Sequence, residues 1–397
     1  MTVFRVPATV LLCLCLACAA RATPFTPSDD AQVLERVPRR ADNPRARQLA
    51  LLRDAVRQSP HDADAAARLA EHWIDDALAE GDPRYVGYAQ AALAPWWADA
   101  APPAAVRVQR AVIQQYAHHF DAALADLSAV TDDEPWQVQA WAWQAAIHLV
   151  RADYAAAGRA CDEMAPLVAP LTAAACRAQV DALVGRAEAA ARVLAQALAE
   201  AGSDTSAAER VWALTRLAEI EERRGDFTAA ERAFRDALSR DVPDVYLLSA
   251  YADFLLDRGR AAEVLALLAD KARADVLLLR LALAAQATND ARATRWRDEV
   301  SARFDAARAR GDRTHEKEES RFALVLRRDA ARALDLSQRN FELQREPSDA
   351  RVLLEAALAV GTRAARDAAQ PALQWLDAHR VESVVLQPLA QRVKALP

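Results

Sequence analysis

The sequence is poor in the residues that β-sheets and tightly folded catalytic loops require. Only 9 of its 397 residues are glycine, aromatic residues make up 6%, and runs of β-branched residues are largely missing. A sheet core therefore has little to build from. Alanine, the best helix former, supplies much of the 53% hydrophobic content. The composition therefore predicts an all-α protein.

Lysine is almost absent, and the positive charge is not clustered. Lysine occurs only at Lys271, Lys317 and Lys394, and arginine mostly alternates with Asp and Glu. The net charge is −6. Nucleic-acid binding depends on clustered cations that displace counterions from phosphates, so we expect no nucleic-acid partner.

The first 22 residues have the pattern of a targeting signal. The uncharged stretch 6–20 is too short to span a bilayer and is typical of a signal peptide. Small residues around Arg21 predict cleavage after Ala22, and hence a periplasmic or secreted protein. The alternative is a lipid anchor on Cys18, although Cys15 stands where such motifs usually have leucine. No later stretch is apolar enough for an integral membrane span.

Residues after the signal divide by composition and periodicity. Residues 23–44 are rich in proline and charge and predict an extended leader. We expect helix hairpins in an N-terminal set, 45–201, and a C-terminal set, 202–380, with a capping helix in 381–397. The predicted hairpins begin near residues 62, 104, 138, 171, 211, 245, 274, 314 and 347. The final helix is expected at about 382–394, kinked or split at Pro388.

Two spacings of 34 residues indicate internal repeats. Gly225 and Gly259 stand 34 residues apart, and the stretch 119–122 aligns with 153–156 at the same offset. Glycine suits the turn of a helix hairpin because it adopts positive φ without steric cost. Five of the nine glycines fall at predicted turns between paired helices. A repeat array therefore explains where the few glycines are.

The residues 213–244 resemble the tetratricopeptide repeat (TPR) family. Small residues at Ala218 and Ala230 suit the crossing of paired helices, with Phe227 and Phe234 filling the gaps between them. Residues 104–201 resemble the family less closely, and 62–97 and 273–380 only weakly. The resemblance implies an α-solenoid of stacked antiparallel helix hairpins, a right-handed superhelix whose first helices line its concave side.

The resemblance also implies which side chains face the concave groove. These are Trp212, Thr215, Glu219, Glu222 and Arg223 in one repeat, and Tyr246, Ser249, Asp253 and Asp257 in the next. Two aromatic rings beside four carboxylates would suit a basic or amphipathic peptide from a protein partner. The alternative is an ordinary solvated helix face.

Recognisable catalytic motifs are missing from the sequence after residue 22. It has no phosphate-binding glycine loop, nucleophile elbow or Cys-x-x-Cys pair. The segment 315–319, His-Glu-Lys-Glu-Glu, has Glu319 where a zinc protease helix needs a second histidine. Acidic residues also favour the first turn of any helix. We therefore expect no catalytic residues, metal or other cofactor.

Two cysteines, Cys161 and Cys176, remain after the predicted signal peptide. They fall in helices of successive hairpins that stack, so a disulfide is sterically conceivable. Two buried thiols are the other possibility.

The leading functional hypothesis is a cell-envelope scaffold that mediates protein–protein interaction through its concave groove. A self-assembling structural array is a second hypothesis, and a metal-dependent enzyme with a site at 315–319 is a third. The partner, the process and the oligomeric state do not follow from the sequence.

Overall fold

A computed structural model describes Asp29 and residues 44–397. The predicted signal peptide, 1–22, lies outside the described residues, as does the predicted leader, 23–44, apart from Asp29 and Pro44. Contacts divide the chain into two units, Met1–Gln48 and Leu49–Pro397. In the first unit, the structure describes Asp29 and the start of helix α2 (Pro44–Gln58). The remaining described helices belong to the second unit.

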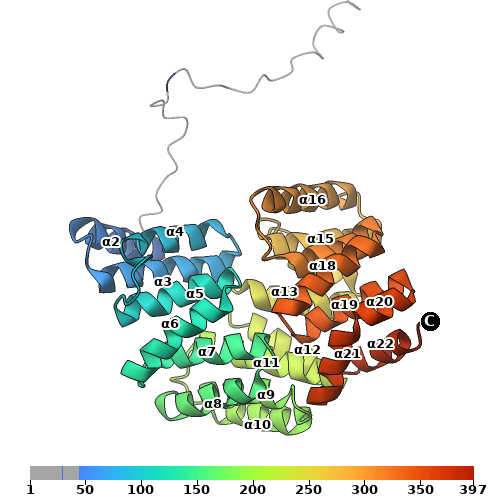
Figure 1. Cartoon of the computed structure of the whole chain (residues 1–397), viewed down its shortest axis with the longest axis horizontal. Helices are drawn as coiled ribbons and strands as arrows, with labels where there is room; N and C mark the ends of the chain where they lie inside the picture. Colours follow the sequence, from blue (N-terminus) through green and yellow to red (C-terminus); the bar gives the residue numbers. More distant parts are fainter. Residues whose placement is uncertain (1–28, 30–43) are drawn as a thin grey trace, which may run out of the picture. The chain divides into compact units, whose positions relative to one another are not determined.

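Consecutive helices of the second unit pair into antiparallel hairpins (Figure 1). The pairs are α3 (Ala63–Glu80) with α4 (Arg84–Ala92), α5 (Ala104–Tyr116) with α6 (Phe120–Asp133), α7 (Val138–Val150) with α8 (Tyr154–Met164), α9 (Pro170–Asp181) with α10 (Ala187–Glu200), α11 (Ala207–Arg224) with α12 (Phe227–Leu238), α13 (Val245–Asp257) with α14 (Ala261–Leu267), α15 (Asp275–Thr288) with α16 (Ala293–Ala309), α17 (Glu316–Phe322) with α18 (Ala330–Leu343), and α19 (Pro347–Val360) with α20 (Arg363–Ala368) and α21 (Gln370–His379). Helix α22 (Leu386–Lys394) follows them, and the short helical turns are η2 (Ala94–Trp96), η3 (Ala165–Leu167) and the π-helical η4 (Ala323–Arg327). No strand occurs among the described residues, and the predicted all-α solenoid is confirmed.

Each hairpin turn in the second unit contains a residue with positive φ. Five of these residues are the predicted glycines, Gly81, Gly185, Gly225, Gly259 and Gly361. The other four turns use His118, Ala152, Asn289 and Arg328. A side chain in this region costs roughly 1–2 kcal/mol, so the surrounding packing must hold these four turns in place.

Small residues lie where paired helices cross, as expected from the repeat pattern. Ala218 and Ala230 are fully buried between α11 and α12, and Phe234 is buried beside them. The expected core role of Phe227 is wrong, because its side chain is 40% exposed. Its ring instead stacks against the guanidinium of Arg258, 3.6 Å from the ring centre.

Two helices begin at other residues than expected. Helix α11 starts at Ala207, four residues before the predicted start, because Ser206 and Glu209 form a capping box. Helix α22 starts at Leu386, since Ser383 Oγ accepts a hydrogen bond from the Leu386 amide. Pro388 therefore falls in the first turn, where a missing amide hydrogen is tolerated, and it does not split the helix.

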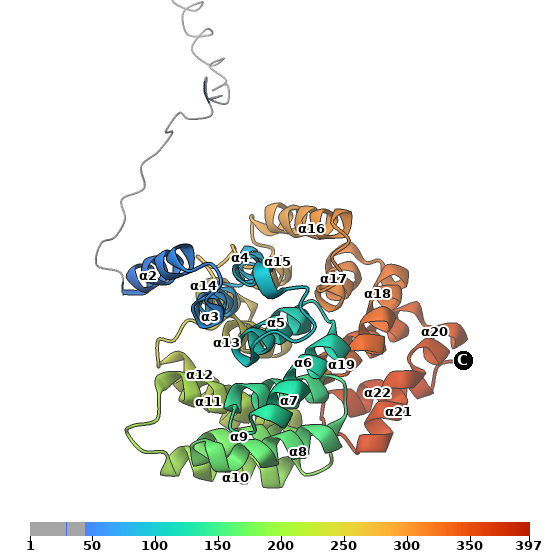
Figure 2. The same cartoon turned by 60° about the vertical axis from the view of Figure 1, so that its left-hand side comes forward.

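Residues far apart in the sequence meet where hairpins of the second unit touch later hairpins. The Val384 amide donates to the Arg223 carbonyl at 2.9 Å, and the Arg345 amide donates to the Val150 carbonyl at 2.7 Å. Helix α3 contacts α13, and the α3–α4 turn lies against Val245 and Ala274 (Figure 2). These contacts bring the first helices of distant repeats around a common interior.

Candidate binding site

An interior cavity of about 560 Å³ lies among the first helices of the second unit. Residues from every first helix, α3 through α19, line it, and the segment 383–386 before and into α22 closes part of it. This arrangement matches the concave surface implied by the TPR resemblance. Carboxylates outnumber arginine and lysine side chains on its wall, and leucine, isoleucine and valine side chains lie between them.

Seven of the nine residues predicted for the groove line this cavity. They are Glu219, Glu222, Arg223, Tyr246, Ser249, Asp253 and Asp257. Trp212 and Thr215, which lie nearer the start of α11, do not line it. Thr215 is buried with its hydroxyl donating to the Val211 carbonyl, and Trp212 packs against the core between α9, α10 and α11.

Asp253 is held by two arginines rather than being free for a ligand. Arg280 of α15 and Arg321 of α17 each donate to a different oxygen of Asp253 at 2.6 Å. Burial alone would raise the pKa of Asp253, but the two guanidinium groups lower it to about 2. Asp253 therefore stays ionised and ties three first helices together.

Asp257 and Glu219 also have partners on the cavity wall. Arg351 of α19 binds Asp257 through both terminal nitrogens, at 2.5 and 2.8 Å. Glu219 pairs with Arg216 at 2.9 Å and accepts a hydrogen bond from the Tyr246 hydroxyl at 2.5 Å. Bidentate and charge-assisted contacts of this kind fix orientation as well as adding energy. These carboxylates therefore hold the helices of the cavity wall in position.

Glu222 differs from these carboxylates because no hydrogen bond reaches it from the described residues. Its closest cation is Arg258, whose Nη2 lies 3.9 Å from Glu222 Oε1. That guanidinium stacks on two rings, 3.6 Å from the Phe227 centre and 4.5 Å from the Phe254 centre. Burial and then the nearby charge of Asp257 raise the pKa of Glu222 to about 7.

Arg223 and Ser249 line the cavity without polar side-chain partners. The Arg223 side chain has no hydrogen bond or ion pair among the described residues, and its Nε is buried and unsatisfied. Ser249 Oγ is likewise buried and unsatisfied. Because buried polar groups are normally hydrogen-bonded, these two side chains call for a partner such as water or a ligand.

The structure adds a group of wall residues that sequence reasoning missed. His315, Lys317 and Glu318, at the start of α17, face the same cavity, as does Glu346 before α19. Burial opposes a charge on Lys317, but Asp349 and Glu318 raise its pKa. The repeats that contain these residues match the TPR pattern only weakly. The pattern therefore does not show that these side chains face the concave side.

Glu316 and Glu319 of the segment 315–319 are paired with arginines. Glu316 pairs with Arg313 and Arg339, each at 3.0 Å, and Glu319 pairs with Arg308 and Arg332. No group of three or more metal-binding side chains lies together among the described residues. The acidic residues of this segment thus bind arginines of neighbouring helices.

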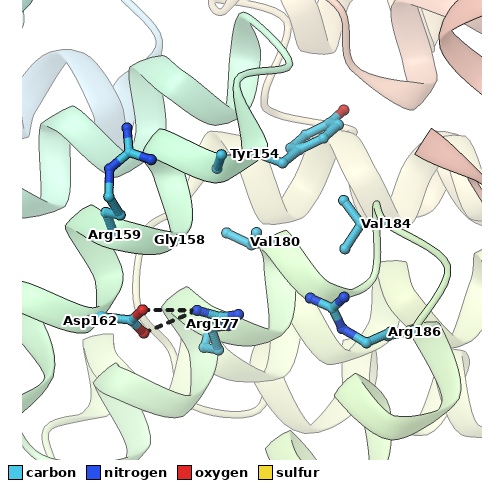
Figure 3. A pocket seen from close by; sticks show the side chains of 9 residues that line it. Tyr154, Gly158, Arg159, Asp162, Arg177, Val180, Val184 and Arg186 are labelled. Carbon is cyan, nitrogen blue, oxygen red and sulfur yellow. Dashed lines mark hydrogen bonds and ion pairs between the residues drawn. The ribbon is translucent and has the colours of Figure 1, made fainter. Parts of the chain in front are cut away.

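Cys161 of α8 and Cys176 of α9 form a disulfide between successive hairpins, with Cα atoms 5.7 Å apart. Both side chains are buried. A second hollow of about 390 Å³ lies on the surface nearby, between α8, α9 and the turn before α10 (Figure 3). Arg177 crosses it and donates to both oxygens of Asp162, at 3.0 and 3.1 Å (Figure 3). Arg177 is thus already paired.

The helix pairs, their 34-residue offsets and the cavity between first helices define a TPR-like α-solenoid. No family model matches the chain, and no curated protein matches it. No helix of the described part is long and apolar enough to cross a membrane.

Several solved structures are similar to this chain at low identity. A tetratricopeptide repeat protein from Parabacteroides merdae is 14% identical, with a TM-score of 0.36, covering 73% of this chain and 98% of its own. The P58(IPK) TPR domain is 17% identical, with a TM-score of 0.21, covering 80% and 93%. A structure of Naa15/Naa10 bound to HypK-THB is 14% identical, with a TM-score of 0.25, covering 88% and 63%. The TM-scores are low, and the class of the fold rests on the helix pairs of this chain itself.

Proposed function

We propose that this chain is an exported, non-catalytic scaffold that holds a segment of a partner protein in its interior cavity. The observation that supports this most directly is the convergence of all first helices on one cavity with unsatisfied polar atoms in its wall. Its volume of about 560 Å³ is in the range of pockets that enclose small ligands. A short extended segment fits such a space, and a folded domain does not.

The wall offers both contacts that a peptide needs. Leu78, Leu149 and Val276 supply apolar surface for side chains. The terminal nitrogens of Arg223, which have no partner among the described residues, supply donors for a carbonyl group of a peptide backbone. The paired aspartates keep these groups in position, so binding does not have to order the site first.

Photocrosslinking tests this function and separates it from self-assembly. A benzophenone amino acid replaces Tyr246, which lines the cavity, or Trp136, which is 63% exposed on the α6–α7 loop and serves as the matched aromatic control. We expect the probe at position 246, and not the one at position 136, to crosslink to one contiguous segment of another protein in envelope extract. Crosslinks to a second copy of this chain would support the structural array instead. Equal products from both positions, or none from Tyr246, would refute binding in the cavity.

Export is supported by the apolar stretch 6–20 and by the disulfide, because disulfides persist in oxidising compartments. Cell fractionation followed by mass spectrometry of the intact chain tests it. We expect the mature protein to begin at Thr23 in the periplasm or medium. A lipidated chain beginning at Cys18 would show that the protein is anchored to a membrane after export. An uncleaved chain in the cytoplasm would refute both free export and lipid anchoring.

A further inference from the structure

Within α11 and α13, the cavity wall has one arginine without a polar partner and one carboxylate without a hydrogen bond. The arginine is Arg223, and the carboxylate is Glu222. Donors require acceptors such as peptide carbonyls, whereas a carboxylate requires a cation or another donor. Together they describe a ligand with both kinds of group.

Most charged groups around Glu222 are paired with one another, and the one cation paired with Glu222 lies at a distance. On α11, Arg216 pairs with Glu219, and on α13, Asp253 and Asp257 hold arginines from α15, α17 and α19. The charged groups before and on α17 and α19 that also line the cavity are His315, Lys317, Glu318, Glu346 and Glu355.

Each nearby cation is committed to another group or held at a distance. Arg351 binds Asp257 and Glu355, and Arg258 stacks on two phenylalanine rings. Arg223 makes no contact with Glu222 that meets the distance of an ion pair. The position beside Glu222 therefore favours an added positive charge.

We propose that the bound segment carries a lysine or arginine whose side chain pairs with Glu222, while one of its backbone carbonyls accepts a hydrogen bond from the terminal nitrogens of Arg223. This inference rests on the proposed function, since it names the chemistry of the segment held in the same cavity. The sequence pattern suggests four carboxylates that could bind a basic side chain, and this inference assigns that binding to Glu222. Asp253, Asp257 and Glu219 keep a positioning role through their own ion pairs.

Binding of such a segment must depend on pH. Burial and Asp257 raise the pKa of Glu222 to about 7, so its carboxyl group is mostly protonated below neutrality. A cation gains the full interaction only with the ionised form, and its binding must therefore release a proton at lower pH. A neutral ligand of the same shape lacks this dependence.

Two tripeptides with the same shape and different charge test the inference on the full mature chain. The probes are acetyl-Ala-Arg-Ala-amide and the same peptide with citrulline, an uncharged isostere of arginine, in place of arginine. Titration calorimetry or ligand-observed NMR gives the affinities at pH 8 and pH 5.5. We expect the arginine peptide to bind about tenfold tighter at pH 8, as for a charge-assisted hydrogen bond, and to lose that advantage at pH 5.5.

Glu222→Gln should remove the preference for arginine and its pH dependence without changing the affinity for the citrulline peptide. Glu188→Gln, the same change at an exposed site of α10, should leave both affinities unaltered. Equal binding of both peptides to the wild-type chain would overturn the cation inference and leave binding in the cavity standing. At peptide concentrations of about 10 mM, binding with a dissociation constant above 1 mM is still detected. If neither peptide binds at this concentration and the probe at position 246 gives no crosslink, both the cation inference and binding in the cavity fail.

Discussion

Replacing Gly81 with alanine tests whether the α3–α4 turn packs against a later part of the repeat array. Gly81 has a φ of 66°, in the left-handed region, and its amide donates to the Ala77 carbonyl. An added Cβ would stand 2.8 Å from the Ala274 Cβ and 3.3 Å from a Val245 methyl group. Val245 is the first residue of α13 and Ala274 directly precedes α15, both more than one hundred and fifty residues later.

The expected loss has two parts with separate causes. A non-glycine residue at positive φ costs roughly 1–2 kcal/mol. Forcing an extra methyl group between packed atoms costs roughly 1–3 kcal/mol more. Gly81→Ala should therefore lower the free energy of unfolding by about 2–5 kcal/mol.

Gly259 is the matched control because it has almost the same backbone and no close neighbour. Its φ is 68°, and an added Cβ would meet no atom within 4 Å. Gly259→Ala should lose only the backbone part, roughly 1–2 kcal/mol. Urea unfolding followed by circular dichroism and tryptophan fluorescence compares the two variants. Equal losses would refute the contact between the α3–α4 turn and the later repeats.

Three further changes have outcomes that follow from single contacts. Glu222→Gln should raise the free energy of unfolding at pH 8 by about 1–3 kcal/mol and leave it unchanged at pH 4. The pKa of this carboxyl group is 4.5 in the unfolded chain and about 7 in the folded one, so the stability of the wild-type chain falls as pH rises between those values. Thermal melts in which the variant and the wild-type chain are equally stable at every pH would contradict this prediction. Asp253→Asn should cost about 3 kcal/mol at pH 8 because two arginines lose their carboxylate. A loss that is not smaller at pH 2, where about half of Asp253 is itself protonated, would point to another cause. The disulfide between Cys161 and Cys176 closes a loop with a sequence separation of 15, and its reduction should lower the free energy of unfolding in urea by about 3 kcal/mol. Two free thiols in the denatured, unreduced protein would show that no bond exists.

The hairpins could be predicted because the information for them is local. Ser206 and Glu209 cap α11 within four residues, and Gly225 ends it with a positive φ of 89°. Alanines such as Ala218 and Ala230 mark where the paired helices cross. Turns without glycine were harder to recognise, since nothing in the sequence around Ala152 or Arg328 shows that the backbone turns left-handed there.

The candidate site could be predicted in part. The TPR pattern placed seven of the nine suggested residues on the cavity, because the face of a helix follows from its register. Thr215 is buried, and Trp212, on the same face of α11 as Glu219, packs against neighbouring helices; a local pattern shows neither. The residues of α17 were missed because the pattern there is too weak to set a register.

The sequence by itself determined the helices, most of their turns and the side of each hairpin that is concave, since all of these depend on neighbours within about one repeat. Only the tertiary structure decided which carboxylates are free. Asp253 and Asp257 receive arginines from α15, α17 and α19, and the last of these partners is 94 residues away. Glu222 has only Arg258, 3.9 Å away and without a hydrogen bond, and that guanidinium stacks on two phenylalanine rings. Charge pairing across a cavity depends on how distant repeats are brought together, which no local pattern encodes.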